Sequence, residues 1–294
     1  MQSDIMNYCI CVSGNLGLVV LNNLLQKPIN IAAVLTDKHS DEIISTCENS
    51  DVKCFAGNPR NGKAYSWIKE KGLEFDILLS INYLFILETD ILNLPKYAIN
   101  FHGSLLPRYR GRTPHVWAII NGEKEVGITA HLMNDKCDDG DIVKQVIIPV
   151  EEEDTGAKIL TKYNETYPSM VDEIIDDIES GNVKAKPQDI SKATYFGKRT
   201  PEDGQINWDW QKERIRNWVR AQANPYPGAF TFCNGQKVVI NRIEYTDHGF
   251  QDIIVNGTVI DIIDTTPFIK VQNGVVKLTD YITDYKLVIN DILQ

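Results

Sequence analysis

Short apolar runs separated by polar and glycine-containing segments mark the first part of the chain. Residues 8–12 and 31–35 are almost wholly apolar, and polar residues or glycine bound each run, as is typical of buried strands. Residues 16–25 lie between them and space their apolar side chains along one face of a helix. A strand, a helix and a second strand in this order predict the opening of a parallel sheet.

The same alternation continues to about residue 180. Further strands are predicted at residues 76–80, 97–101, 127–133 and 141–149, and helices at residues 63–71, 115–120 and 155–178. The fold class is therefore α/β, with a Rossmann-like first domain. The turn at residues 13–17 contains two glycines but lacks the Gly-x-Gly-x-x-Gly pattern, so it predicts a tight strand-to-helix turn and no nicotinamide dinucleotide.

The pattern changes after residues 181–188, which are polar and have no clear period. We predict a boundary near residue 200, with one domain at 1–200 and a smaller, mainly antiparallel β domain at 201–294, joined by a helix at 208–220. Three Asn-Gly pairs separate alternating runs in the second domain and indicate β-hairpins. The pairs are at residues 234–235, 256–257 and 273–274.

Composition narrows the class of protein. A chain of 294 residues with 43% hydrophobic and 24% charged residues can bury one large or two ordinary cores. It has no apolar run near the roughly 18 residues that a membrane helix needs, and the start Met1-Gln-Ser-Asp-Ile lacks the basic region of a secretory signal. We therefore expect a cytoplasmic protein with no membrane partner. The net charge of −10 disfavours a nucleic-acid partner.

The six cysteines contain no Cys-x-x-Cys pair and have no histidine at zinc-finger spacing. This argues against a metal site and against a disulfide framework, so we expect reduced thiols and no bound metal. Cys9 and Cys11 share one face of a predicted strand and are interpreted as small core residues.

Asn100 and His102 end a predicted strand, and Asp138 follows in an acidic stretch that contains Gly140. Residues two apart on a strand share a face, so Asn100 and His102 should point the same way from the carboxyl end of the sheet, where open α/β folds bind ligands. An amide can donate to a developing oxyanion, an imidazole can move a proton, and a carboxylate can orient the imidazole. Each residue by itself also fits a structural role, whereas together they suit acyl transfer to an amine.

The segment Asn100-Phe-His-Gly-Ser-Leu-Leu-Pro-Arg-Tyr-Arg-Gly-Arg-Thr-Pro114, which continues through residues 117–123 and 127–131, resembles the folate-dependent formyltransferases. A second block, residues 193–208 with 219–230, is similar to the region that follows the catalytic domain in longer members. The resemblance covers most of residues 75–230, and the sugar-nucleotide N-formyltransferases are the most similar group. It implies that Asn100, His102 and Asp138 are catalytic.

The resemblance also implies the donor N10-formyltetrahydrofolate, whose pterin would lie beside the loop after the strand at residues 76–80. Some relatives carry an arginine where this chain has Leu84. No Walker-type phosphate loop is present, so ATP is not implied. The residues expected to bind the cofactor are Ile81, Asn82, Tyr83, Leu84, Asp138 and Asp141.

Two basic clusters are candidates for the acceptor's phosphates, because a guanidinium fork binds a pyrophosphate bidentately. One is Arg108, Arg110 and Arg112, and the other is Lys198 and Arg199. The same side chains could instead pair with some of the chain's 40 acidic residues. The residues expected to bind the acceptor are Arg112, Lys198, Arg199, Asn224 and Tyr226.

From this resemblance we expect formyl transfer from the folate to the amine of a nucleoside-diphosphate-linked amino-deoxy sugar, for cell-envelope polysaccharide of the O-antigen type. Asn100 would stabilise the oxyanion and His102 would move the amine proton, with the rate falling toward acid pH. The resemblance also suggests a homodimer through the C-terminal domain. Two alternatives stay open: a methionyl-tRNA formyltransferase, which requires a basic face, and a non-catalytic folate- or nucleotide-binding protein.

Overall fold

The computed structural model describes residues 6–294. The start of the chain, on which the expectation about a secretory signal rests, lies outside the described residues. The chain divides into two compact units. The first contains the described residues up to Gly111, with Gly127–Ile148 and Lys162–Tyr195, and the second contains Arg112–Val126, Pro149–Thr161 and Phe196–Gln294.

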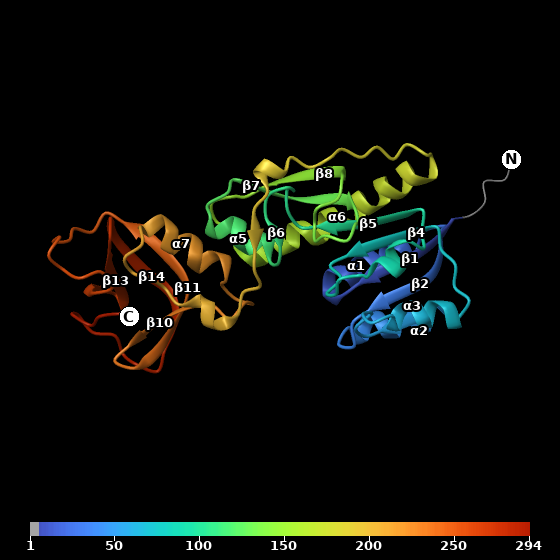
Figure 1. The fold of residues 1–294 in the computed structure, drawn as a ribbon. Helices are drawn as coiled ribbons and strands as arrows, with labels where there is room; N and C mark the ends of the chain where they lie inside the picture. The colour runs from blue at the N-terminus through green and yellow to red at the C-terminus, as the bar shows by residue number, and fades with distance from the viewer. Residues whose placement is uncertain (1–5) are drawn as a thin grey trace. The chain divides into compact units, whose positions relative to one another are not determined.

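A seven-stranded sheet forms the centre of the first unit, in the order β3-β2-β1-β4-β5-β7-β8 (Figure 1). The five strands from β3 to β5 in this order are parallel, and β7 is antiparallel to β5. This mixed sheet with helices confirms the predicted α/β class. The strands are β1 (Asn7–Val12), β2 (Asn30–Thr36), β3 (Cys54–Ala56), β4 (Ile77–Ile81), β5 (Tyr97–His102), β7 (Glu125–Leu132) and β8 (Ile142–Pro149).

Helices cover both faces of this sheet because the strand residues are apolar on both sides. On one face Cys9 and Cys11 of β1 pack in a core cluster with Ala64 and Ile68 of a helix. On the other face the Tyr8 hydroxyl lies 3.3 Å from a carboxylate oxygen of Glu179. The helices are α1 (Gly14–Leu24), α2 (Asp41–Asn49), α3 (Lys63–Glu70), α4 (Thr89–Leu92) and α6 (Gly156–Glu179).

Two short strands, β6 (Arg110–Gly111) and β9 (Tyr195–Phe196), pair with each other in a separate two-stranded sheet. The backbone N–H of Arg110 donates to the carbonyl of Thr194 at 2.9 Å. Arg110 and Thr194 are 84 positions apart, so this bond joins the segment that follows Asn100 and His102 to a distant part of the chain. Two 3₁₀ helices follow the same region, η1 (Ile190–Lys192) and η2 (Pro201–Gly204).

The second unit contains a five-stranded antiparallel sheet in the order β10-β11-β14-β13-β12, which confirms the predicted β domain (Figure 1). Two helices, α5 (Pro114–Ile120) and α7 (Lys212–Ala221), contact each other, and α7 packs on β11. The predicted helix at 208–220 therefore begins four residues later. The strands are β10 (Ala229–Cys233), β11 (Gln236–Thr246), β12 (Val259–Ile263), β13 (Thr266–Val271) and β14 (Gly274–Ile282).

Two of the three Asn-Gly pairs form the predicted hairpins, and the third does not. Asn234 and Gly235, with φ of 48° and 77°, join β10 to β11, and Asn273 lies between β13 and β14. The pair at 256–257 precedes β12 without closing a hairpin, so that prediction is wrong. The Asn256 side chain instead bonds to Asp209 and Lys270, and the tight turn between β12 and β13 falls at residues 264–265.

Within residues 6–294, none of the helices combines the length and the apolar character needed to pass through a lipid bilayer.

Candidate active site

Asn100 of β5 faces His131 of β7 across the antiparallel pair, since the two residues are direct partners in the strand register. The Asn100 Nδ2 atom lies 3.2 Å from the His131 Nε2 atom, and the His131 Nδ1 atom lies 2.9 Å from the carbonyl of Leu132. Only a protonated Nδ1 can donate to that carbonyl, so in the neutral ring Nε2 is the acceptor for the amide. His131 thereby fixes the orientation of the Asn100 amide, with its nitrogen toward His131.

His102 is buried, with 8% of its surface exposed, and both of its ring nitrogens face acceptors. The Nε2 atom lies 2.8 Å from the carbonyl of Tyr109, to which it donates. The Nδ1 atom lies 3.6 Å from the Oδ1 atom of Asp138. The hydrogen bond to Tyr109 thus orients the ring so that Nδ1 faces the carboxylate of Asp138.

Asp138 lies in the loop between β7 and β8, with a left-handed φ of 54°. Its Oδ2 atom accepts the backbone N–H of Gly111 at 2.9 Å and the thiol of Cys137 at 3.2 Å. Its Oδ1 atom is 3.6 Å from His102 and 3.7 Å from His131. Burial by itself would raise the pKa of Asp138, but the charge of His102 and the hydrogen bonds that Gly111 and Cys137 donate outweigh it and hold the pKa well below its usual range. The carboxylate is therefore ionised at neutral pH.

The structure thus gathers Asn100, His102 and Asp138, with His131 as an additional member of the group. His131 contacts Asn100 directly and lies within ion-pair distance of Asp138. Sequence reasoning missed its role because the pairing depends on β7 running antiparallel to β5. The signal that could have found it is a histidine within a mainly apolar strand, Val126-Gly-Ile-Thr-Ala-His131.

The loop expected to bind the cofactor begins at the carboxyl end of β4, next to β5 in the sheet. Ile81 is fully buried, and Tyr83 packs its ring against the core cluster. Asn82 has a φ of 52°, and its side chain donates to the carbonyl of Ser13 at 2.9 Å. Leu84 is 48% exposed. The exposed side chains of this loop are therefore those of Asn82, Leu84 and Ile86, the last of which is 58% exposed.

Asp141, the other residue of the expected cofactor set outside this loop, is half-buried just before β8. Its carbonyl accepts the backbone N–H of Leu132 at 2.9 Å, which closes the base of the loop that carries Asp138.

The residues expected to bind the acceptor belong to the second unit. Among them, the Arg199 guanidinium lies between two indole rings, 4.4 Å from the ring centre of Trp218 and 4.9 Å from that of Trp117. Its Nη2 atom donates to the carbonyl of Asp203 and to the side chain of Gln222. Burial lowers the pKa of Arg199. The role of this arginine in binding phosphate stays a prediction.

Tyr226, another of these residues, pairs with His115. The Tyr226 hydroxyl lies 2.9 Å from the Nε2 atom of His115, and burial lowers the pKa of His115 to about 4. The histidine is thus neutral at pH 7, and a hydrogen bond joins its Nε2 atom to the Tyr226 hydroxyl. Lys198, Arg112 and Asn224 are exposed at the surface of the same unit.

One member of the predicted basic clusters is not available to phosphate. Arg110 is only 1% exposed, and its guanidinium contacts Asp139, Gln188 and Tyr195 inside the first unit. For Arg110 the structure favours the alternative of pairing with an acidic residue, because Asp139, Gln188 and Tyr195 occupy its donors.

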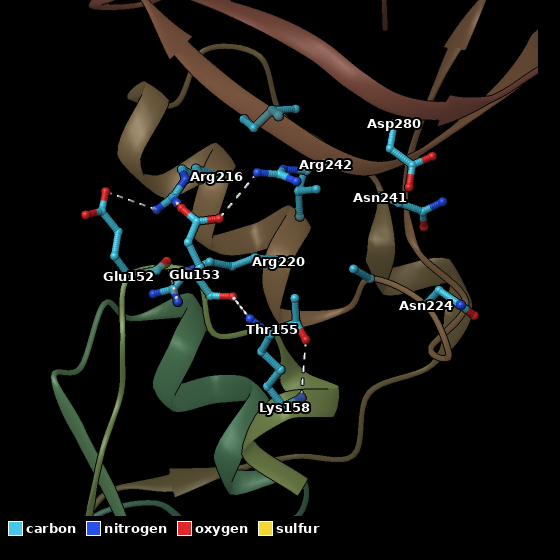
Figure 2. A pocket seen from close by; sticks show the side chains of 13 residues that line it. Glu152, Glu153, Thr155, Lys158, Arg216, Arg220, Asn224, Asn241, Arg242 and Asp280 are labelled. Atoms are coloured by element: carbon cyan, nitrogen blue, oxygen red, sulfur yellow. Dashed lines mark hydrogen bonds and ion pairs between the residues drawn. The ribbon is translucent and has the colours of Figure 1, made fainter. Parts of the chain in front are cut away.

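A pocket of about 290 Å³ lies within the second unit, and Figure 2 shows the side chains that line it. Its cations are largely paired: Arg216 contacts Glu152 at 3.7 Å as well as Glu153, and Arg242 contacts Glu153 at 3.7 Å. Asn224 is also part of the lining. An anion in this pocket would have to replace existing ion pairs, so we interpret it as a structural network.

Arg220 in this network donates to three carbonyls of the turn before α6, those of Glu151, Glu152 and Asp154, at 3.3, 3.4 and 2.7 Å. Replacing Arg220 by methionine removes a charged donor from the turn and should lower the free energy of unfolding by about 1–3 kcal/mol. Arg242→Gln, which removes an exposed ion pair of the same pocket, should change it by less than about 1 kcal/mol. Urea unfolding of both variants measures the difference, and equal effects would contradict this role.

No group of three or more histidine, cysteine, aspartate or glutamate side chains in the described part of the chain is arranged to hold a metal ion. No disulfide joins the cysteines of that part.

Comparison with known proteins places two family models on the chain. The model described as "Formyl transferase" matches residues 21–175, and the one described as "Formyl transferase, C-terminal domain" matches residues 198–288. The first of these covers more than half of the 294 residues.

Solved structures share the fold. An N-formyltransferase from Helicobacter canadensis, solved with folinic acid and dTDP-3-aminofucose, is 19% identical with a TM-score of 0.73, over 94% of this chain and 100% of that one. A sugar N-formyltransferase from Shewanella sp. is 24% identical with a TM-score of 0.64, over 81% and 97%. A methionyl-tRNA formyltransferase from Clostridium thermocellum is 18% identical with a TM-score of 0.57, over 83% and 95%.

Proposed function

The chain belongs to the formyl transferase family, and from this premise we propose that it transfers a formyl group from N10-formyltetrahydrofolate to the amine of a nucleoside-diphosphate-linked amino-deoxy sugar. The observation that supports this most is the group formed by Asn100, His102 and Asp138 beside the loop after β4. It combines an oriented amide donor, an ionised carboxylate and a buried imidazole, which are the groups that acyl transfer to an amine needs.

The residues present fit a folate donor. The loop after β4 presents the exposed apolar side chain of Leu84 and the exposed Asn82, and β4 is hydrogen-bonded to β5, on which Asn100 lies. A flat ring needs an apolar surface with a few polar groups at its edge. When bound, N10-formyltetrahydrofolate would supply the formyl carbon that the amine attacks.

Each residue of the group has a distinct role in the proposed reaction. His131 occupies one N–H of the Asn100 amide, and the second N–H can donate to the formyl oxygen as negative charge develops there. His102 is the group that can take the proton lost by the amine, since its Nδ1 atom has no proton in the neutral ring whose Nε2–H donates to Tyr109. The ionised Asp138, 3.6 Å from Nδ1, stabilises the positive charge that the ring then gains. Because Nε2 of His102 is bonded to Tyr109, the proton reaches the pair from the side of Asp138 or through water.

A sugar nucleotide is favoured over tRNA as the acceptor. The Helicobacter canadensis protein, to which this chain is similar over nearly its whole length, was solved with an amino sugar nucleotide. The likeness to the methionyl-tRNA formyltransferase is lower, at a TM-score of 0.57. The net charge of −10 also works against binding of a polyanion.

The experiment that tests this function follows formyl transfer by mass spectrometry. N10-formyltetrahydrofolate is supplied with thymidine-, uridine- and guanosine-linked amino sugars, and with charged initiator tRNA in a separate reaction. We expect one amino sugar nucleotide to gain a single formyl group, and the tRNA to gain none. Transfer to the tRNA alone would establish the methionyl-tRNA alternative, and no transfer to any acceptor would favour a non-catalytic binding protein.

The proposal extends to the setting of the enzyme. We place the reaction in the cytoplasm, supplying a formylated sugar for cell-envelope polysaccharide of the O-antigen type.

We also propose a homodimer through the second unit, where large apolar side chains are exposed, among them Ile253, Val255 and Ile282. Sedimentation equilibrium tests the dimer, and a monomer at all concentrations would contradict it.

A further inference from the structure

Gln188 is a buried amide whose oxygen and nitrogen are both fully engaged. Its Oε1 atom accepts from Arg110, at 2.7 Å from Nη2 and 3.3 Å from Nε. Its Nε2 atom donates to the carbonyls of Asp138 and Gly140, at 2.9 and 2.7 Å. A side chain from a segment 50 positions away thus holds the backbone on either side of Asp139.

Arg110 fixes this amide in turn. It is 1% exposed, and its guanidinium bonds to Gln188, to the Asp139 carboxylate and to the Tyr195 hydroxyl, with the Tyr195 ring 5.4 Å from Cζ. A buried guanidinium is tolerated only where its donors are satisfied, and its planar fork allows few other orientations. Arg110 therefore contacts the loop twice, through the carboxylate of Asp139 and through Gln188.

The loop that these two side chains hold carries Asp138 in a strained conformation. A φ of 54° at a non-glycine residue costs free energy unless the surroundings enforce it. Gly140, two residues after Asp138, has no room for a side chain, because a Cβ atom there would lie 1.7 Å from the carbonyl of Leu132. The position of the Asp138 carboxylate thus depends on how firmly the loop backbone is anchored.

We propose that Arg110 and Gln188 are positioning residues that hold the Asp138 carboxylate against His102 for formyl transfer. The hydrogen bonds of the two side chains go to each other, to Tyr195 and to the loop that carries Asp138, so their effect on His102 passes through the loop. The inference rests on the proposed function for its kinetic consequence, but the placement of Asp138 against His102 can be measured without any turnover.

Gln188→Glu is the sharpest test, because it preserves the size of the side chain and leaves Arg110 with an acceptor. It removes the two N–H donors to the Asp138 and Gly140 carbonyls and puts a carboxylate oxygen in their place. A misplacement of about 1 Å can cost about 10²-fold in rate. We expect kcat to fall by about 10- to 100-fold, with KM for both substrates within about twofold of the original.

The matched control is Lys136→Gln. Lys136 is an exposed cation 3.8 Å from Asp139, so this change removes a charge from the same carboxylate without touching the anchors of the loop. We expect kcat within about twofold of the original enzyme. An equal loss in both variants would assign the effect to charge around Asp139 and would overturn the proposal.

The second readout is the ¹⁵N NMR signal of the His102 ring, assigned by its absence in His102→Gln. In Gln188→Glu this signal should move toward that of Asp138→Asn, where the carboxylate is missing. Arg110→Lys, which keeps the charge but loses the fork, should move it the same way. A folded Gln188→Glu protein with an unchanged His102 signal overturns the proposal, as does a rise in KM at constant kcat. If the original enzyme transfers no formyl group, the proposed function fails, and the NMR result still decides the positioning role.

Discussion

Replacing Asp138 by asparagine is expected to lower kcat by about 10²- to 10⁴-fold. The substitution keeps the shape of the side chain but removes the charge that faces His102 at 3.6 Å and His131 at 3.7 Å. A neutral amide cannot stabilise the positive charge that His102 gains with the proton of the amine, and its N–H group can occupy the Nδ1 atom that must accept that proton. Steady-state kinetics with N10-formyltetrahydrofolate and the acceptor sugar nucleotide measure the loss.

Asp135→Asn is the matched control, since Asp135 is an exposed aspartate of the same loop and has no place in the site. It should leave kcat within about twofold. A loss in Asp138→Asn no larger than in the control would contradict the proposed role of the carboxylate.

The original protein and Asp138→Asn also allow a test of stability. The pKa of Asp138 is depressed in the folded protein, so its ionised form contributes stability above the unfolded pKa of about 4, and that contribution is lost as the pH falls through the folded pKa. The difference in unfolding free energy between the original protein and Asp138→Asn should therefore shrink as the pH is lowered below about 4. Urea unfolding at a series of pH values measures it, and a difference that grows toward acid would contradict the depressed pKa.

Asn100→Ala is expected to lower kcat by about 10²- to 10³-fold, the usual cost of losing an oxyanion donor. The effect should fall on kcat with KM little changed, because the donor is needed only when negative charge develops on the formyl oxygen. Asn100→Asp should be at least as damaging, since it replaces the donor by an acceptor next to the His131 Nε2 atom.

Asn182→Ala serves as the control for this series. Asn182 is an exposed asparagine that follows α6, and its side chain donates to the hydroxyl of Ser180. Single-turnover kinetics separate the chemical step from binding. A rate constant for chemistry in Asn100→Ala within threefold of the control would remove Asn100 from the mechanism.

Much of the parallel sheet is predictable from the sequence because its strands are continuous apolar runs. The strands that begin near Tyr8, Ile31 and Ile77 have no other simple interpretation. The sequence does not predict α2 or β3. The strand β3 has three residues, and α2 buries only two side chains along its length, so neither carries a measurable period.

The residues of the site also include some that the sequence predicts and some that it does not. Asn100 and His102 can be found because they lie two apart on one predicted strand, and Asp138 because a family resemblance points to it. His131, Arg110 and Gln188 cannot, since their contacts depend on the antiparallel register of β7 and on a bond between segments 50 positions apart. Local periodicity carries no information about such pairings.

The Arg199 side chain held between Trp117 and Trp218 has a practical consequence for optical studies. Of the chain's five tryptophans, Trp67 alone belongs to the first unit. The other four belong to the second unit and are Trp117, Trp208, Trp210 and Trp218. Indole emission during denaturation will therefore report mainly on the second unit, and its spectrum will change when the stacked guanidinium leaves the rings. Loss of the first unit has to be followed by another signal, such as the far-ultraviolet ellipticity of its helices.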